Sequence, residues 1–293
     1  MEIKRIEDTQ INNPTGFNPI KAIIIIFVFI FVVWGVWYAI SKINPSGPRG
    51  AAKSGFNLAS SSLQVKKTDV TPTQDSYYKD YIKITMNTAA KESYPEKEYI
   101  VITAIQPNLS AVDISNWKLQ NSKGETATFG KGTTLPASGK VNPVAAIKIN
   151  GGDILTVSSG RSPIGVSFQM NACALYLEQF QDFIPQIKEP CPQPENDKGF
   201  FSLDGTCQRF VSQLPRCEAN TKTLPAEISS SCKTFINAHV NYNGCVASHK
   251  NDNYFSSKEW KIFLGRTSEL WAEPNDTITL LDNEGKIIDA VKY

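Results

Sequence analysis

Residues 276–293 read DTITLLDNEGKIIDAVKY, and this stretch carries the clearest structural signal in the chain. Two short runs of β-prone residues, Asp276–Leu281 and Lys286–Tyr293, flank the sequence Asp282-Asn-Glu-Gly285. A short loop that ends in glycine between two such runs is typical of a β-hairpin. The sequence therefore predicts two antiparallel strands joined by this loop.

Further short strands are expected upstream of this hairpin. Ile82, Ile84 and Met86 alternate with polar residues, which indicates a strand with one buried face. EYIVITA at 98–104 is apolar on both faces, which indicates an interior strand. The other expected strands are Ile114–Leu119, Thr126–Phe129, Ala145–Ile149, Ile154–Ser158 and Trp260–Leu264. Many short strands separated by glycine-containing turns predict a mainly β fold of the sandwich type.

Three of these stretches resemble the lamin tail domain, a family of immunoglobulin-like β-sandwiches. They are EYIVITA at 98–104, VDISNWKLQNSKGE at 112–125 and NDTITLLDNEGKIIDAVKY at 275–293. The matching residues are Val112, Asp113, Ile114, Ser115, Trp117, Asp276, Thr277, Ile278, Leu280, Leu281, Asp282, Gly285, Ile288 and Asp289. The resemblance covers roughly residues 94–160 and 260–293, and it implies an interaction module that contacts a protein or the cell envelope.

Physical chemistry assigns structural roles to the main residues of this pattern. Trp117 is expected to fill the core, because aromatic side chains bury the most area. Gly285 is expected to adopt a positive φ in the hairpin loop. Asp113 and Asp289 could be mistaken for a catalytic carboxylate pair. Turn and backbone-capping roles are favoured, because short carboxylates readily bond nearby backbone amides.

All the cysteines of the chain lie in one region. They are Cys173, Cys191, Cys207, Cys217, Cys232 and Cys245. No two have the C-x-x-C spacing of zinc ribbons or thioredoxin-type sites. Cys173, Cys207 and Cys232 each begin an apolar stripe with helical spacing, and a second cysteine in a loop-like stretch follows each stripe. The sequence predicts a small helical insert stapled by three disulfides, and it leaves their pairing open.

The two histidines lie in the same region. His239 shares an apolar helix face with Phe235 and is interpreted as a core residue, whereas His249, in the polar run SHKNDN, is expected to be solvated. Asp252 near His249 hints at an acid–base pair, but no nucleophile accompanies it. The sequence contains no P-loop, Rossmann glycine set, G-x-S-x-G or H-E-x-x-H motif. We therefore predict no catalytic residues, no cofactor and no metal site.

An apolar segment near the N-terminus predicts a membrane anchor. AIIIIFVFIFVVWGVWYAI at 22–40 is uncharged and, at about 1.5 Å per residue, long enough for a hydrocarbon core of about 30 Å. The prediction is a transmembrane helix at 22–41 after a cytoplasmic segment at 1–21. The clustered cysteines suit an oxidising compartment and so place the C-terminal part outside the cell. The alternatives are a cleaved signal peptide and a pilin-like precursor cleaved after Gly16, although Lys21 stands where that family has glutamate.

The remaining segments follow from composition and pattern. Residues 42–76 are rich in proline, glycine and serine, which predicts a flexible linker. Residues 77–160 and 258–293 are expected to form the lamin-tail-like sandwich. Residues 161–257 are expected to form the cysteine-rich insert, so the sequence predicts one interrupted domain.

These features predict a membrane-tethered, extracytoplasmic binding or surface-structural module at the cell membrane, with an unknown protein or envelope partner. The net charge of +2 provides no broad basic field, so no nucleic-acid partner is expected. Aromatic residues of the insert are candidate anchors for a partner, namely Tyr242, Tyr254 and Phe255. The alternatives are a pilin-like component and an unfamiliar envelope enzyme with perturbed groups near His249, Asp252 or Glu178.

Overall fold

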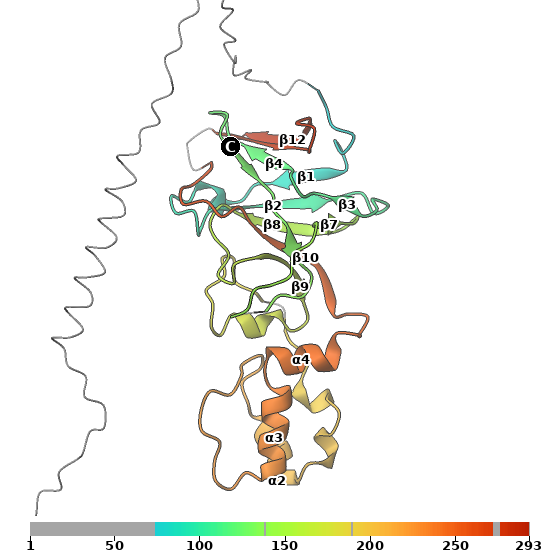
Figure 1. Cartoon of the computed structure of the whole chain (residues 1–293), viewed down its shortest axis with the longest axis vertical. Coiled ribbons are helices and arrows are strands. Elements are labelled where there is room, and N and C mark those ends of the chain that lie inside the picture. The colour runs from blue at the N-terminus through green and yellow to red at the C-terminus, as the bar shows by residue number, and fades with distance from the viewer. Residues whose placement is uncertain (1–73, 138, 189, 272–275, 293) are drawn as a thin grey trace, which may run out of the picture. The chain divides into compact units, whose positions relative to one another are not determined.

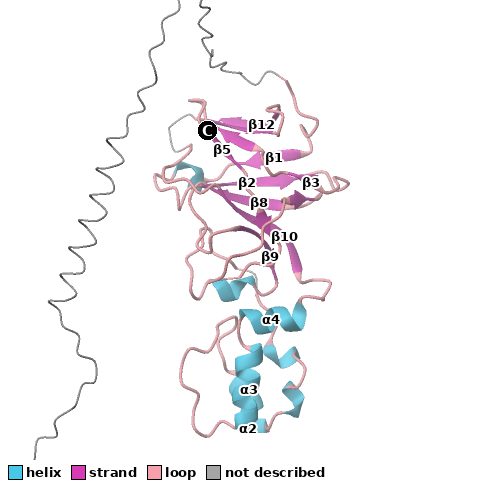
Figure 2. Ribbon diagram, in the orientation of Figure 1, coloured by secondary structure: helices cyan, strands magenta, loops and turns pink. Residues whose placement is uncertain are grey.

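The structure is a computed structural model of the chain, and it describes residues 74–137, 139–188, 190–271 and 276–292. All of these residues belong to one unit of the chain, Thr68–Tyr293. Figures 1 and 2 show the strands of this unit gathered at one end and its longer helices at the other. The described part of the chain is therefore a β body with a helical insert.

The larger sheet has six strands and carries the insert. In order across the sheet they are β1 (Ile82–Thr85), β2 (Tyr99–Ala104), β8 (Ile154–Ser158), β10 (Ser256–Phe263), β9 (Ser167–Asn171) and β6 (Gly132–Thr133). β10 pairs with β8 in parallel, and so does β6 with β9, whereas the other pairs are antiparallel. The insert leaves the sheet after β9 and returns at β10. Because these two strands are hydrogen-bonded neighbours, both ends of the insert are fixed side by side.

The second sheet confirms the predicted hairpin. Its four antiparallel strands are, in order, β12 (Ile287–Lys292), β11 (Thr277–Leu281), β4 (Lys118–Gln120) and β5 (Thr126–Thr128). The loop between β11 and β12 is closed by a hydrogen bond from Asp282 N to Lys286 O at 3.0 Å. Gly285 has a φ of +80°, as the loop prediction requires. A short third sheet pairs β3 (Val112–Asp113) with β7 (Lys148–Ile149).

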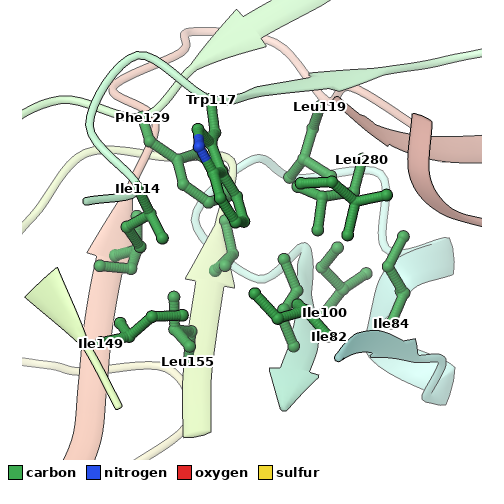
Figure 3. Packing of buried hydrophobic residues seen from close by; sticks show 14 of the residues in the cluster. Ile82, Ile84, Ile100, Ile114, Trp117, Leu119, Phe129, Ile149, Leu155 and Leu280 are labelled. Atoms are coloured by element: carbon green, nitrogen blue, oxygen red, sulfur yellow. The ribbon is translucent and has the colours of Figure 1, made fainter. Parts of the chain in front are cut away.

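Buried residues from both larger sheets form one hydrophobic core (Figure 3). Ile100 and Leu155 come from the six-stranded sheet, and Leu119 and Leu280 come from the four-stranded sheet. Trp117 lies in the turn before β4 and is only 2% exposed, which confirms its predicted core role. Burying a large apolar side chain of this kind stabilises a fold by about 2–3 kcal/mol.

The aspartates of the sequence pattern bond backbone amides. Asp113 Oδ1 accepts a hydrogen bond from Ser115 N at 2.8 Å within its own turn. Asp289 Oδ2, on β12, accepts one from Ile84 N of β1 at 2.8 Å and so joins the two larger sheets at their edges. Asp282 Oδ1 accepts two amides of its own hairpin loop at 2.9 Å. Asp113 thus has the predicted turn role, whereas Asp289 bonds the backbone of a distant strand and not of its own turn.

The helices of the described chain are short, and most lie in the insert. They are the 3₁₀ helices η1 (Thr88–Lys91), η2 (Ala174–Leu177), η3 (Pro194–Asn196) and η4 (Phe200–Ser202) and the α-helices α2 (Gly205–Ser212), α3 (Ser230–His239) and α4 (Tyr242–His249). α2 and α3 contain the predicted Cys207 and Cys232, and each is capped by a side chain that accepts the amide of its cysteine. The prediction of an α-helix that begins at Cys173 is wrong, because only the four-residue η2 forms there. Cys173 is its N-cap residue and offers no side-chain hydrogen bond.

The six cysteines form three disulfides, as predicted. The pairs are Cys173–Cys245, Cys191–Cys217 and Cys207–Cys232. Cys245 lies within α4, although a loop was expected around it. The first pair joins the start of the insert to its last helix, and the third pair joins α2 to α3.

The predicted fold class included a transmembrane helix, and this part of it is corrected. No helix among the described residues is long and apolar enough to cross a membrane. The longest described helix of the insert, α3, has 10 residues and spans about 15 Å, half of a hydrocarbon core. The predicted segment at 22–41 lies outside the described residues, as do 1–21 and the linker up to residue 73.

The sheets also differ from the immunoglobulin-like arrangement that the resemblance implied. An immunoglobulin sandwich is built from antiparallel sheets, whereas the six-stranded sheet here is mixed, with two parallel pairs. One of its strands, β9, lies within the stretch 161–257 that was assigned to the insert, and β6 was not predicted at all. The described chain is accordingly a mainly β fold with three sheets and three disulfides.

Candidate binding groove on the insert

Two hollows lie next to each other on the insert. The first has a volume of about 330 Å³ and the second about 200 Å³. Ala219 lines both hollows. The adjacent residues Gln179 and Phe180 line the first and the second hollow respectively. We call the two hollows together the insert groove.

Half of the residues that line the first hollow are apolar, and three of these also contact the insert core. Phe210 belongs to α2, Leu214 follows that helix, and Leu224 comes from the long loop before α3. All three are partly buried against the core of α2 and α3. Glu218 and Lys222 are the charged residues of its lining. The hollow therefore combines an apolar part with polar side chains, among them one charge of each sign.

The second hollow is lined by aromatic residues from both ends of the insert. Tyr176 and Leu177 belong to η2, and Tyr242 begins α4. Phe180 follows η2 and is 58% exposed, although its side chain is large and apolar. An exposed aromatic ring at the edge of a hollow is the type of residue that dominates binding energy at protein interfaces.

A side-chain bridge separates the two hollows. Gln179 Nε2 donates to Ala219 O at 3.0 Å, and Ala219 N donates to Gln179 Oε1 at 2.8 Å. The amide of one side chain thus satisfies both backbone groups of Ala219. Without it, the two backbone groups of a residue that lines both hollows would need other partners.

Disulfides hold the segments that form the groove. Cys217 lies two residues before Ala219 and is bonded to Cys191. Arg216 strengthens this connection, because its guanidinium donates to Cys191 O at 2.7 and 3.0 Å. The Cys173–Cys245 bond joins the residue before η2 to α4, and these two elements supply the walls of the second hollow.

Both histidines of the insert bond one buried aspartate, Asp197. His239 Nδ1 of α3 lies 2.7 Å from Asp197 Oδ2, and His249 Nε2 of α4 lies 2.9 Å from Asp197 Oδ1. Ser248 Oγ donates to Asp197 Oδ2 at 3.1 Å. His249 Nδ1 also lies 2.8 Å from Asp252 Oδ2. Asp197 directly follows η3, so its carboxylate connects the end of η3 with the helices α3 and α4.

The electrostatics around this cluster follow from burial and hydrogen bonding. Burial, with a smaller effect of the Asp197 charge, raises the pKa of Tyr176 to about 12. Burial likewise raises the pKa of Tyr242 to about 12. A hydrogen bond with Tyr254, and then one with His249, lowers the pKa of the Asp252 carboxyl. The two phenols that line the second hollow are accordingly neutral over the physiological pH range.

The structure changes several residue assignments made from the sequence. His249 is buried, so its predicted solvation is wrong, because its ring lies between Asp197 and Asp252. His239 is half-buried and hydrogen-bonded, as a satisfied histidine of the insert should be. Glu178 bonds the amide of Ile187 and is not part of the histidine cluster.

Of the three aromatic anchor candidates, one lines the groove. Tyr242 lines the second hollow, Tyr254 is exposed outside it, and Phe255 is buried in the cluster around the disulfides. The sequence missed Gln179 and Phe180. A glutamine and a phenylalanine carry no motif of their own, and only the fold brings Ala219 next to them.

The acid–base pair suggested by the sequence lies apart from the groove. Neither His249 nor Asp252 lines either hollow of the groove. Among the described residues, no group of three or more histidine, cysteine, aspartate or glutamate side chains has an arrangement that could hold a metal ion. All six cysteines are consumed by disulfides.

Comparison with known proteins adds no relative. No family model matches the chain, and no curated protein matches it. The resemblance to lamin tail domains therefore rests on the quoted residues alone.

Proposed function

We propose that this chain is an extracytoplasmic binding module whose insert groove holds an extended segment of a partner protein. The observation that carries the proposal is the pairing of two hollows, each with apolar side chains in its lining, across the Gln179–Ala219 bridge, with the exposed Phe180 at one of them. A polypeptide segment with two apolar side chains, one for each hollow, fits this arrangement. The position of Phe180 at the edge of a hollow, and not its exposure alone, favours an interaction surface here.

The rigidity of the groove supports binding rather than simple packing. Two disulfides and the Gln179 bridge hold its walls before any partner arrives. A preorganised surface loses less conformational entropy on binding, so more of the contact energy appears as affinity.

Three disulfides support the extracytoplasmic part of the proposal, because such bonds persist in oxidising compartments. The β body would act as the scaffold that presents the insert, since binding residues commonly lie on loops positioned by rigid elements. The resemblance to lamin tail domains implies the same general class of interaction module.

Peptide selection on the full disulfide-bonded chain tests the proposal. A displayed library of random linear peptides is expected to yield binders with two apolar residues, and Phe180→Ser should weaken them about tenfold or more. Phe201→Ser is the matched control, because Phe201 is also on the insert and 83% exposed but does not line the groove. Equal effects of the two substitutions, or a selection without binders, would contradict the proposal.

A further inference from the structure

A third hollow, of about 340 Å³, lies on the β body rather than on the insert. It is lined by residues just before β6, by the loop that leads into β9 and by the end of β10. The six that matter for its chemistry and shape are Gly130, Lys131, Arg161, Gly165, Phe263 and Gly265. We call this hollow the sheet-edge cleft. β9 enters the insert at its other end, so the cleft and the insert lie at opposite ends of that strand.

The cleft is kept open by glycines and by a fixed loop. A Cβ atom added at Gly130, Gly165 or Gly265 would meet no atom within 4 Å, so these positions border open space. Gly165 has a φ of +76°, which a larger residue would adopt only with strain. The loop before β9 is closed internally, because Ser162 Oγ donates to Val166 O at 2.7 Å and Gly165 N donates to Ser162 O at 3.0 Å.

The charge of the cleft has a single sign. Lys131 and Arg161 are both exposed, and no carboxylate residue lines the cleft. Within the described part of the chain, neither cation has a hydrogen-bonding or ion-pairing partner for its side chain. Arg266, next to Gly265, differs in this respect, since its guanidinium lies 3.6 Å from Glu125 Oε2. Cationic groups around a concave surface concentrate the electric field and attract anions.

The lining also supplies an apolar surface beside the cations. Phe263 is partly buried, and with Val144 and Val166 it forms the apolar part of the cleft. A guanidinium forms paired hydrogen bonds with carboxylate or phosphate oxygens, and an ammonium adds a point charge. The volume falls at the small end of the range for ligand pockets, roughly 300–1,000 Å³.

We propose that the sheet-edge cleft binds a small organic anion, with its carboxylate or phosphate group at Lys131 and Arg161 and its apolar part against Phe263. This inference does not depend on the insert groove, because the two share no lining residue. Failure of peptide binding at the groove would therefore leave the proposal for the cleft unaffected, and the reverse also holds.

Titration of the full chain with phenyl phosphate, followed by ligand-observed NMR, tests the proposal. Phenyl phosphate has one anionic group and one aromatic ring, and benzyl alcohol is the neutral comparison. Binding of phenyl phosphate with a millimolar or lower dissociation constant is expected, and it should weaken as salt is added. Benzyl alcohol should bind at least about tenfold more weakly, because it lacks the charge that the two cations recognise.

Matched variants locate the binding. Lys131→Ala/Arg161→Ala should raise the dissociation constant about tenfold or more, whereas Lys118→Ala/Arg209→Ala removes the same charge from exposed positions outside the cleft and should leave it unchanged. Arg161→Lys keeps the charge without the planar fork and should give an intermediate value. Absence of binding, equal binding of benzyl alcohol, or equal losses in the two double variants would each overturn the proposal.

Discussion

The side-chain amide of Gln179 forms hydrogen bonds with both backbone groups of Ala219, at 2.8 and 3.0 Å, across 40 residues of sequence. This relationship places the segment after η2 beside the segment after Cys217. Both segments line the insert groove. A glutamine can form such a pair because its amide carries a donor and an acceptor side by side.

Removal of this bridge should loosen the groove with a modest effect on stability. Gln179→Ala deletes two hydrogen bonds and is expected to lower the free energy of unfolding by about 1–2 kcal/mol. Chemical denaturation of the oxidised protein measures this change. Gln213→Ala, at an exposed position outside the groove, is the control and should change stability by less than about 0.5 kcal/mol. A loss in the control as large as that in Gln179→Ala would contradict the assignment.

Asp197 should be the most sensitive position of the histidine cluster. Its side chain is 3% exposed and bonds both histidines, so Asp197→Asn places a neutral amide opposite both imidazoles in place of the carboxylate. The expected loss of stability is about 2 kcal/mol, because the hydrogen bonds to a charged carboxylate are lost or weakened. Asp182→Asn on the exposed surface of the insert is the matched control. Denaturant unfolding of the two variants compares them, and equal stabilities would show that the cluster contributes nothing specific.

Lys261 should make the free energy of unfolding depend on pH in the alkaline range. Its side chain is buried on β10 and donates to Pro185 O at 2.6 Å, and burial lowers its pKa to about 8. The unfolded chain therefore binds this proton more tightly than the folded chain. The free energy of unfolding should accordingly rise by about 2 kcal/mol between about pH 8 and about pH 10.

Lys261→Met lacks the titrating group. The difference in free energy of unfolding between wild type and variant should therefore change by the same amount over that pH range. Urea unfolding at several pH values gives both curves. The tyrosines with raised pKa act above this window, since burial keeps Tyr176 and Tyr242 protonated until about pH 12. Parallel curves for wild type and variant would contradict the burial of a titrating ammonium at this position.

The disulfides should stabilise the insert separately from the β body. Replacing Cys207 and Cys232 by serine opens a loop of 25 residues and should cost about 3 kcal/mol, and the 72-residue Cys173–Cys245 loop should cost about 4 kcal/mol. Hydrogen exchange on each variant is expected to show faster exchange in α2, α3 and α4. Exchange in β2 and β8 should stay slow, because their core is independent of the insert. Loss of protection in β2 and β8 would contradict this separation.

Local signals in the sequence predicted the parts of the fold that depend on local interactions. The β11–β12 hairpin follows from a turn that Asp282 and Gly285 stabilise within a few residues. α2 and α3 have capping side chains at Asp204 and Ser229, and helices form there. The same apolar spacing after Cys173 produced only a 3₁₀ turn, since no such cap precedes it. Periodicity alone therefore overestimated that helix.

Long-range interactions account for what the sequence did not reveal. His249 lies in a polar run, yet Asp197, 52 residues earlier, makes it part of a buried cluster. β9 lies in the stretch assigned to the insert, and it forms a strand of the sheet because β10 returns beside it after the insert. The groove likewise depends on a contact between residues far apart in the sequence, Gln179 and Ala219. Cysteine spacing indicated that disulfides form, but only the folded chain determines which sulfur atoms meet.

A hydrogen-exchange footprint of a selected peptide on the full oxidised chain tests the proposed groove most directly. The account predicts slower exchange on binding in residues 176–180 and 219–224, the segments that line the two hollows, with no change in β2 or β8. Protection confined to the β body, with none in the insert, would contradict the assignment of binding to the insert groove.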